Sequence, residues 1–281
     1  MYNTLLFYKY QGAGNDFLIA DNRDGSMQLS AEQVAKLCDR RYGIGADGLM
    51  LLESSAECDF RMVYYNSDGS GGMMCGNGGR CIVAFAADRG LDSFVFEAAD
   101  GLHEAEILSA DGDTRIIRLK MKDVADIMHY DMLEGVEVCS EGYFLDTGTR
   151  HYVRFVDDVD DYDVVSEGRA IRYGAVQLLP VGANVNFVEP CPDHIKVRTY
   201  EKGVEDETYA CGTGIVASCL ASAKRGIRPA SADADGRWKY DVKARRDALS
   251  VDFIPCGDFL AKDVWLTGPA AFVAEIKVNV I

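Results

Sequence analysis

The chain has 281 residues, 48% of them apolar, which suits one large domain or two of about 140 residues. With 29 Lys and Arg against 45 Asp and Glu its formal net charge is −16, so no nucleic acid partner is expected, because phosphate-backbone binding needs clustered cations. Residues 1–11 lack the pattern of a secretory signal and no run of about 18 apolar residues occurs, so we expect a cytoplasmic protein with no membrane partner.

Cysteine and histidine usage points to reduced thiols rather than to disulfides or metal. Nine cysteines are an odd number, the chain is long for a disulfide scaffold, and no Cys-x-x-Cys pair occurs. The four histidines are scattered, so no metal site is expected. The acidic tract from Asp157 to Asp163 lacks EF-hand spacing and is interpreted as a solvated loop rather than a calcium site.

The first predicted elements are a strand and a helix. Residues 5–11 alternate as a strand does, and a glycine-rich turn follows at 12–17. Ser30 is a candidate N-cap with Gln33 three residues later, which predicts a helix that Gly43 ends. Further strands are expected at 60–65, 93–97, 103–108 and 115–120.

Residues 43–48 match the pattern G-x-G-x-x-G of dinucleotide-binding loops. In such loops the glycines follow a strand and open a helix, whereas here a helix precedes them and the strand-like run Leu49–Leu52 follows. We therefore interpret these glycines as turn formers.

Two cysteines stand at the start of two predicted helices of one length. Residues 74–81 read Met-Cys-Gly-Asn-Gly-Gly-Arg-Cys and residues 210–214 read Ala-Cys-Gly-Thr-Gly, and each turn runs into an apolar helical stretch. An Arg-Gly pair that is expected to end the helix begins 14 residues after Cys75, at Arg89. A second such pair begins 14 residues after Cys211, at Arg225.

The two cysteine helices belong to a larger repeat. Landmarks recur in order at offsets of 134 to 137 residues: Gly14 and Gly148, Asp47 and Asn184, Tyr64 and Tyr200, Cys75 and Cys211. We infer an internal duplication and an α/β (α+β) fold of two pseudo-symmetric lobes, each a bent antiparallel sheet or barrel around a central helix, with the active site in the cleft. The lobes are expected at 1–121 and 122–269.

A cysteine in the first turn of a helix is a usable base. Free backbone N–H groups and the positive end of the helix dipole favour its thiolate, and neighbouring glycines let a ligand carboxylate approach the same donors. Two such sulfurs beside one bound carbon acid would remove a proton from one face and deliver another to the opposite face, which inverts the carbon.

A single cysteine in such a turn is more often a buried packing residue, and it is the pair that favours catalysis. The packing interpretation is kept for the other seven: Cys38, Cys58, Cys81, Cys139, Cys191, Cys219 and Cys256.

On these residues the chain resembles the cofactor-independent diaminopimelate epimerases over nearly its full length. The motifs are Gly14-Asn15-Asp16-Phe17, residues 43–48, Asn66-Ser67-Asp68-Gly69-Ser70, residues 75–81, Asn184-Val185-Asn186-Phe187, and Glu201 with residues 210–214. Cys-Gly-Asn-Gly is typical of this family, whereas the related proline racemases carry Cys-Gly-His-Gly. The resemblance implies interconversion of LL- and meso-2,6-diaminopimelate, in lysine and peptidoglycan-precursor synthesis, without a cofactor.

The resemblance also implies a fold detail and a set of residue roles. The last strand, 270–281, would complete the first lobe. Cys75 and Cys211 would be the acid/base pair, supported by His151 and Glu201. The diamino diacid substrate would be bound by Asn15, Asn66, Gly76, Asn77, Thr149, Asn184, Glu201, Lys202, Gly212 and Thr213. A homodimer is left open.

Two motifs depart from the family pattern. Thr149 and Arg150 stand where the family has Asn-Pro, and Lys202 stands where it has Arg, in the pocket for the non-reacting end of the substrate. Lysine lacks the bidentate fork of arginine, and threonine lacks an amide. Arg150 either supplies the missing guanidinium or points to solvent. The alternative function is therefore a racemase of another amino acid, and a thiol redox or metal-binding protein is a remote alternative.

Overall fold

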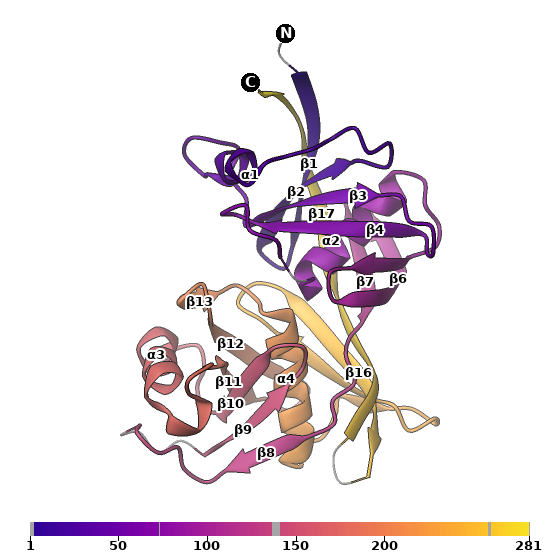
Figure 1. Cartoon of the computed structure of the whole chain (residues 1–281). Helices are drawn as coiled ribbons and strands as arrows, with labels where there is room; N and C mark the ends of the chain where they lie inside the picture. The colour runs from indigo at the N-terminus through magenta and orange to yellow at the C-terminus, as the bar shows by residue number, and fades with distance from the viewer. Residues whose placement is uncertain (1–2, 73, 137–140, 258–259, 281) are drawn as a thin grey trace. The chain divides into compact units, whose positions relative to one another are not determined.

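The computed structural model describes residues 3–72, 74–136, 141–257 and 260–280. The chain divides into two compact units (Figure 1). The first comprises Met1–Leu119 and Gly268–Ile281, and the second comprises Lys120–Thr267.

The first unit is a closed barrel around a buried helix. Neighbouring strands follow in the order β1 (Asn3–Gly12), β2 (Asn15–Asp21), β3 (Gly48–Glu53), β4 (Phe60–Asn66), β5 (Val95–Ala98), β6 (Gly101–Asp111), β7 (Thr114–Lys120) and the second part of β17 (Leu260–Val280). β17 pairs with both β7 and β1, which closes the ring and agrees with the implied return of the last strand. Helix α2 (Gly76–Asp88) is buried from Gly76 to Ala86, as suits its small and apolar residues.

Most strand pairs are antiparallel, as expected, but the sheet is mixed. β2 pairs with β3, and β4 with β5, in parallel. Parallel neighbours need a crossover connection, and the helices supply it: α1 (Ala31–Cys38) joins β2 to β3, and α2 joins β4 to β5.

The second unit repeats this plan. Its successive neighbours are β8 (Ile127–Tyr130), β9 (Gly142–Asp146), β10 (Arg150–Phe155), β11 (Asn184–Pro190), β12 (Ile195–Glu201), β15 (Trp238–Lys243), β16 (Ala248–Cys256) and the first part of β17. The short strands β13 (Asp206–Thr208) and β14 (Ser231–Ala232) flank β12 and β15. The parallel pairs are again joined by helices. The connection from β10 to β11 contains α3 (Val164–Gly174) and the 3-10 turn η1 (Val176–Leu178), and the connection from β12 to β15 contains α4 (Gly212–Lys224).

The strand registers of the two units match. In the first unit, Phe17 lies opposite Gly48, and the corresponding pair in the second unit is His151 and Asn184. Likewise, Met50 lies opposite Tyr64 in the first unit, and the corresponding pair in the second is Asn186 and Thr199. Two landmarks shift by a residue. Because the pair of Phe17 and Gly48 corresponds to the pair of His151 and Asn184, Asn184 corresponds to Gly48 rather than to Asp47. Tyr200 packs in the cluster under α3 as Tyr65 packs under α1, so Tyr200 corresponds to Tyr65 rather than Tyr64, because neighbouring side chains of a strand face opposite sides.

Local signals fixed the start of α1 better than its end. Ser30 and Gln33 form the expected capping box, each side chain accepting the other residue's N–H, at 3.2 and 2.9 Å. The helix ends at Cys38 rather than at Gly43, because the Asp39 carboxylate accepts two main-chain N–H groups and turns the chain.

The remaining expected elements are present. The strands predicted at 49–52, 60–65, 93–97, 103–108 and 115–120 lie within β3 to β7 or overlap them. Residues 43–48 form the turn into β3, with Gly45 at φ +86°. None of the helices described here is both long and apolar enough to span a membrane.

Candidate active site

Cys75 is the N-cap of α2, and its sulfur is bonded to the helix. Its backbone is extended (φ −113°, ψ 149°), and Sγ accepts the main-chain N–H of Gly78 at 3.2 Å. Sulfur here fills the place that a Ser or Asp oxygen takes in ordinary N-caps. This bond and the helix dipole both favour the thiolate.

Two predicted substrate residues, Asn15 and Asn77, are joined side chain to side chain beside this helix start. Asn77 Nδ2 donates to Asn15 Oδ1, and Asn15 Nδ2 donates to Asp47 Oδ2 at 3.0 Å. Arg80, which is fully buried, donates from Nη2 to Asn77 Oδ1 at 2.7 Å. The two amides are therefore held in fixed orientations. The third predicted asparagine of this unit, Asn66, instead donates to Ser70 Oγ within its own turn.

Cys211 is the N-cap of α4 and has different partners. Its backbone is also extended (φ −100°, ψ 110°), but its side chain makes no cap bond to the described first turn. Sγ lies 3.5 Å from Oγ1 of Thr213, and the residue is 8% exposed. Both cysteines thus begin helices of 13 residues, as predicted, yet a main-chain N–H faces one sulfur and a hydroxyl faces the other.

His151 lies on β10 within reach of two hydroxyls. Its Nε2 is 2.9 Å from Oγ1 of Thr149 and 2.9 Å from Oγ1 of Thr213, which are themselves 3.1 Å apart. Its Nδ1 is 3.1 Å from Nδ2 of Asn186. The ring is fully buried, and this burial lowers the pKa of His151 to about 3, so the imidazole is neutral at ordinary pH.

The polar contacts beside the two cysteine helices are pseudo-equivalent. The bond between Asn15 and Asn77 in the first unit corresponds to the contact between Thr149 and Thr213 in the second. Asn15 also donates to Asp47, and Thr149 accepts from Asn184 at 3.4 Å, although Asp47 precedes by one residue the register position that corresponds to Asn184. The positions that recur in the sequence are therefore also the positions that contact one another.

Asn184 connects Thr149 to the turn that carries Lys202. Its Oδ1 accepts the main-chain N–H of Lys202 at 2.8 Å, and the Lys202 side chain is exposed. Glu201 lies next to Lys202, and its Oε2 accepts the Thr208 hydroxyl at 2.8 Å. Three of the residues implied to bind substrate, Thr149, Asn184 and Lys202, therefore lie together in the second unit.

Arg150 does not join them. Because Arg150 begins β10 between Thr149 and His151, its side chain takes the opposite face of the strand from theirs. There its guanidinium lies over the Phe144 ring, 4.9 Å from the centroid, and Nη1 is 3.5 Å from the carbonyl oxygen of Leu178. It neither supplies a guanidinium beside Thr149 nor points freely to solvent.

Sequence reasoning missed Asn186 and Thr199 as members of this group. Asn186 bonds His151, and Thr199 Oγ1 donates to Asn186 Oδ1 at 2.9 Å. The signal was present in Asn184-Val185-Asn186, since residues two apart on a strand share a face.

Three of the other cysteines, Cys38, Cys81 and Cys219, are buried and fit the packing interpretation, whereas Cys58, Cys191 and Cys256 are only partly buried. Burial raises the pKa of the Cys38 thiol to about 11 and holds the pKa values of Cys81 and Cys219 higher still. Such thiols are poor bases at neutral pH. Cys139 lies outside the described residues.

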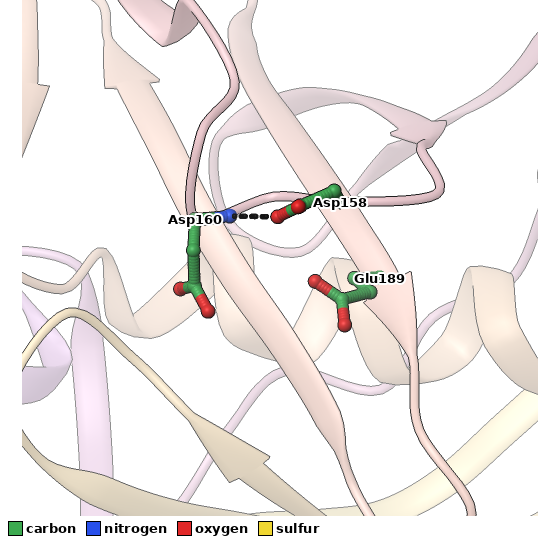
Figure 2. A group of neighbouring side chains, drawn as sticks. All are labelled: Asp158, Asp160 and Glu189. Atoms are coloured by element: carbon green, nitrogen blue, oxygen red, sulfur yellow. Dashed lines mark hydrogen bonds between the residues drawn. The ribbon is translucent and has the colours of Figure 1, made fainter.

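Three carboxylates of the second unit approach one another outside these groups, at Asp158, Asp160 and Glu189 (Figure 2). Lys196 pairs with two of them: its Nζ is 2.7 Å from Asp160 and 3.1 Å from Glu189. The Asp158 carboxylate accepts the N–H of Asp160. The Lys196 ammonium group therefore already occupies the place that a metal ion would take between Asp160 and Glu189.

A cavity of about 280 Å³ adjoins this cluster and is lined by the basic residues Lys196, Arg198, Lys243 and Arg245, three of which lie beside carboxylates. Lys196 is paired as above, and Arg198 bonds Glu207 through two nitrogens at 2.6 and 2.7 Å. Arg245 lies 3.7 Å from the same Glu207.

Solved structures share the fold of this chain. A Bacillus anthracis phenazine biosynthesis protein of the PhzF family matches with a TM-score of 0.73 at 15% identity, covering 99% of this chain and 100% of that one. A probable proline racemase from Agrobacterium radiobacter K84 matches with a TM-score of 0.68 at 16% identity, covering 99% and 93%. The chain is thus an α/β protein of this two-barrel fold, with a cysteine at the start of each buried helix.

The chain belongs to the diaminopimelate epimerase family, whose model matches residues 7–124 and 143–235. It is 47% identical over 267 residues to the diaminopimelate epimerase of Chlorobaculum tepidum, covering 93% of this chain and 96% of that one. It is 42% identical over 278 residues to that of Flavobacterium psychrophilum, covering 96% and 99%. The protein is accordingly an enzyme of the isomerase class.

Proposed function

We propose that this protein interconverts LL- and meso-2,6-diaminopimelate, with Cys75 and Cys211 as its two acid/base groups, and so supplies lysine and peptidoglycan-precursor synthesis. One observation carries the proposal: each of these cysteines is the N-cap of a buried helix at the equivalent position of two similar units. The relatives' names supply the substrate.

In this mechanism one sulfur is a thiolate and the other a thiol. The thiolate takes the α-proton, and the electron pair left on the carbon spreads into the α-carboxylate as an enediolate. The thiol gives its proton to the opposite face, so the configuration inverts and the two sulfurs exchange protonation states.

The starts of α2 and α4 offer the donors that such an enediolate needs. The first N–H groups of a helix have no partner within it, and in this proposal those at Gly76–Asn77 and Gly212–Thr213 hold the reacting carboxylate. Loss of one such donor typically costs about 10²–10³-fold in rate.

In this proposal the residues around Thr149 receive the non-reacting end of the substrate, and Asn15 and Asn66 also bind the substrate. Thr149 and Lys202 are exposed, and Asn184 lies between them. His151 and Glu201 support the thiols.

A racemase of another amino acid is the alternative, and it is favoured by the same residues. The Thr149 hydroxyl is hydrogen-bonded to His151 and Thr213. Lys202 offers a single ammonium charge, whereas an arginine would offer a guanidinium that bonds both oxygens of a carboxylate. A pocket built this way would hold a distal carboxylate less specifically.

The test is deuterium incorporation. Purified protein in D₂O, without pyridoxal phosphate, should place deuterium at the α-carbon of LL-diaminopimelate and form the meso isomer, as followed by NMR. Cys75→Ser and Cys211→Ser should each lower turnover by about 10²–10⁴-fold. Exchange only with a different amino acid would establish the racemase, and a requirement for added metal would overturn the two-thiol scheme.

Thiol catalysis needs reduced sulfurs, so the reducing cytoplasm is the proposed compartment. Activity measured with and without dithiothreitol checks that the cysteines are reduced before any variant is interpreted.

A further inference from the structure

A group of buried polar residues lies beneath the start of α4 in the second unit. The corresponding positions of the first unit are mostly apolar. His151, Asn186 and Thr199 are 0%, 0% and 3% exposed. The residues at the matching register positions under α2 are Phe17, Met50 and Tyr64. Buried polar groups cost stability unless they are fully bonded, so this barrel plan does not itself call for an asparagine and a histidine here.

The amide of Asn186 has one orientation that satisfies all its neighbours. The amide atom 3.1 Å from the carbonyl oxygen of Tyr152 must be a donor, which identifies it as Nδ2. The other amide atom, Oδ1, accepts from Thr199 Oγ1 at 2.9 Å. The second hydrogen of Nδ2 is therefore available for His151 Nδ1, 3.1 Å away.

This orientation fixes the proton on His151. Because Asn186 Nδ2 can only donate, Nδ1 of the neutral ring must accept, and the ring hydrogen must be on Nε2. The negative charge of Asp146, at the end of β9, favours protonation of the ring, but the effect of burial is larger.

The Nε2–H group begins a series of donors that ends at sulfur. It is directed at Oγ1 of Thr213 and Oγ1 of Thr149, each 2.9 Å away, and the Thr213 hydroxyl can donate in turn to Sγ of Cys211, 3.5 Å away. With the other ring tautomer, Nε2 would instead accept, and it would compete with the sulfur for the hydroxyl hydrogen.

We propose that Asn186 is a positioning residue: it holds His151 as the Nε2–H tautomer, so that His151 and Thr213 present hydrogen-bond donors in series to Cys211 Sγ and stabilise its thiolate. This inference rests on the proposed function, in which Cys211 alternates between thiolate and thiol. Neither His151 nor Thr213 carries a net charge, so the Cys211 thiolate is stabilised by the oriented dipoles of these two groups.

Thr149 provides a second acceptor for the Thr213 hydroxyl when the Cys211 sulfur is protonated. When Cys211 is a thiol, the Thr213 hydroxyl no longer has a thiolate to face and turns to Oγ1 of Thr149, 3.1 Å away. Thr213 Oγ1 is then free to accept the S–H while it still accepts from His151. One hydroxyl rotation thus follows each change in the protonation of Cys211.

Gly214 makes room for this arrangement. A Cβ at this position would lie 2.3 Å from Asn186 Oδ1 and 3.2 Å from Cε1 of His151. The glycine after Thr213 therefore lets the helix start pack directly on the asparagine and the imidazole.

The tautomer can be observed directly. In ¹⁵N-histidine-labelled protein, long-range ¹H–¹⁵N correlation spectra distinguish the two neutral tautomers, and His151→Gln identifies the signals of this residue. We expect the Nε2–H form alone in the unsubstituted protein and a mixture in Asn186→Leu. An Nδ1–H form in the unsubstituted protein would overturn the proposal.

The effect on sulfur is measured by the pH dependence of Cys211 alkylation, with iodoacetamide as the probe and peptide mass mapping as the readout. Asn186→Leu and Thr213→Val should each lower the thiolate fraction at neutral pH by about tenfold, a rise of one pKa unit. Thr213→Ser should restore it. Thr199→Val removes only the bond to Asn186 Oδ1 and should destabilise the fold without moving the alkylation profile.

Thr213→Val keeps the proposal testable if Asn186→Leu fails to fold, because Thr213 is only partly buried. An unchanged alkylation profile in Thr213→Val would overturn the donor series. Neither readout needs turnover. If both behave as expected while no deuterium enters any amino acid, the proposed function fails and the donor series stands.

Discussion

Gly78 donates its main-chain N–H to Cys75 Sγ at 3.2 Å, so the atom proposed as a base also caps its own helix. Cys211, at the equivalent place on α4, is approached by the Thr213 hydroxyl instead. The two thiols therefore differ in their surroundings although their helices match. Substitution can separate the chemical role of the sulfur from its capping role.

Replacing Cys75 by Ser should lower α-deuterium exchange by about 10²–10⁴-fold, since an alcohol is a far weaker acid and base than a thiol. Stability in urea should be unchanged or slightly higher, because Ser is a preferred N-cap and can accept the same N–H. Cys75→Ala, the control, should lose both the exchange and about 1 kcal/mol of stability. Normal exchange in Cys75→Ser would contradict the assignment.

Stability should depend on pH through His151. Its pKa is about 3 in the folded state, below the ordinary value of 6.5, so the unfolded chain binds the proton more readily. The stabilisation is complete above pH 6.5 and is lost as pH falls toward 3, at up to about 1.4 kcal/mol per pH unit. Urea unfolding of the parent and of His151→Gln at several pH values checks this, and identical pH slopes would refute it.

Gly214→Ala should destabilise the protein by about 1–3 kcal/mol, because the new Cβ would meet Asn186 Oδ1 at 2.3 Å. The alkylation profile of Cys211 should shift together with stability. Gly71→Ala is the matched control, since a Cβ there meets nothing within 4 Å and the change should stay within about 0.5 kcal/mol. Equal stabilities of the two variants, measured by urea unfolding, would argue against the close contact.

Lys202→Arg should lower KM for diaminopimelate by about tenfold if Lys202 binds the distal carboxylate, because a guanidinium pairs with both carboxylate oxygens. The maximal rate should change little, as the reacting carbon is not involved. Lys239→Arg, at an exposed lysine on β15, should have no effect. A KM that is unchanged in Lys202→Arg would remove Lys202 from the substrate pocket.

Arg150→Ala should leave KM and maximal rate unchanged and lower stability by about 0.5–1 kcal/mol, through loss of the contact with the Phe144 ring. Phe144→Leu should lower stability too and should not add fully to Arg150→Ala in the double variant, because the two residues share one contact. Weaker binding of diaminopimelate by Arg150→Ala would instead restore the hypothesis that Arg150 replaces the family arginine.

Sequence alone determined the features that depend on neighbouring residues. The capping box at Ser30, the turn at residues 43–48 and the two cysteine-capped helices follow from residue types within a few positions of one another. The duplication was also visible, because the matching positions keep nearly constant spacing along the chain.

Only the tertiary structure decided which side chains meet. Asn186 lies 35 residues from His151, and Thr213 lies 62 residues from it; their contact depends on strand register and on which face each side chain takes. The same alternation turns Arg150 away from Thr149, its neighbour in the sequence. Residue types therefore indicated the chemistry at each helix start, whereas the pairing of strands set the orientation of the donors around Cys211.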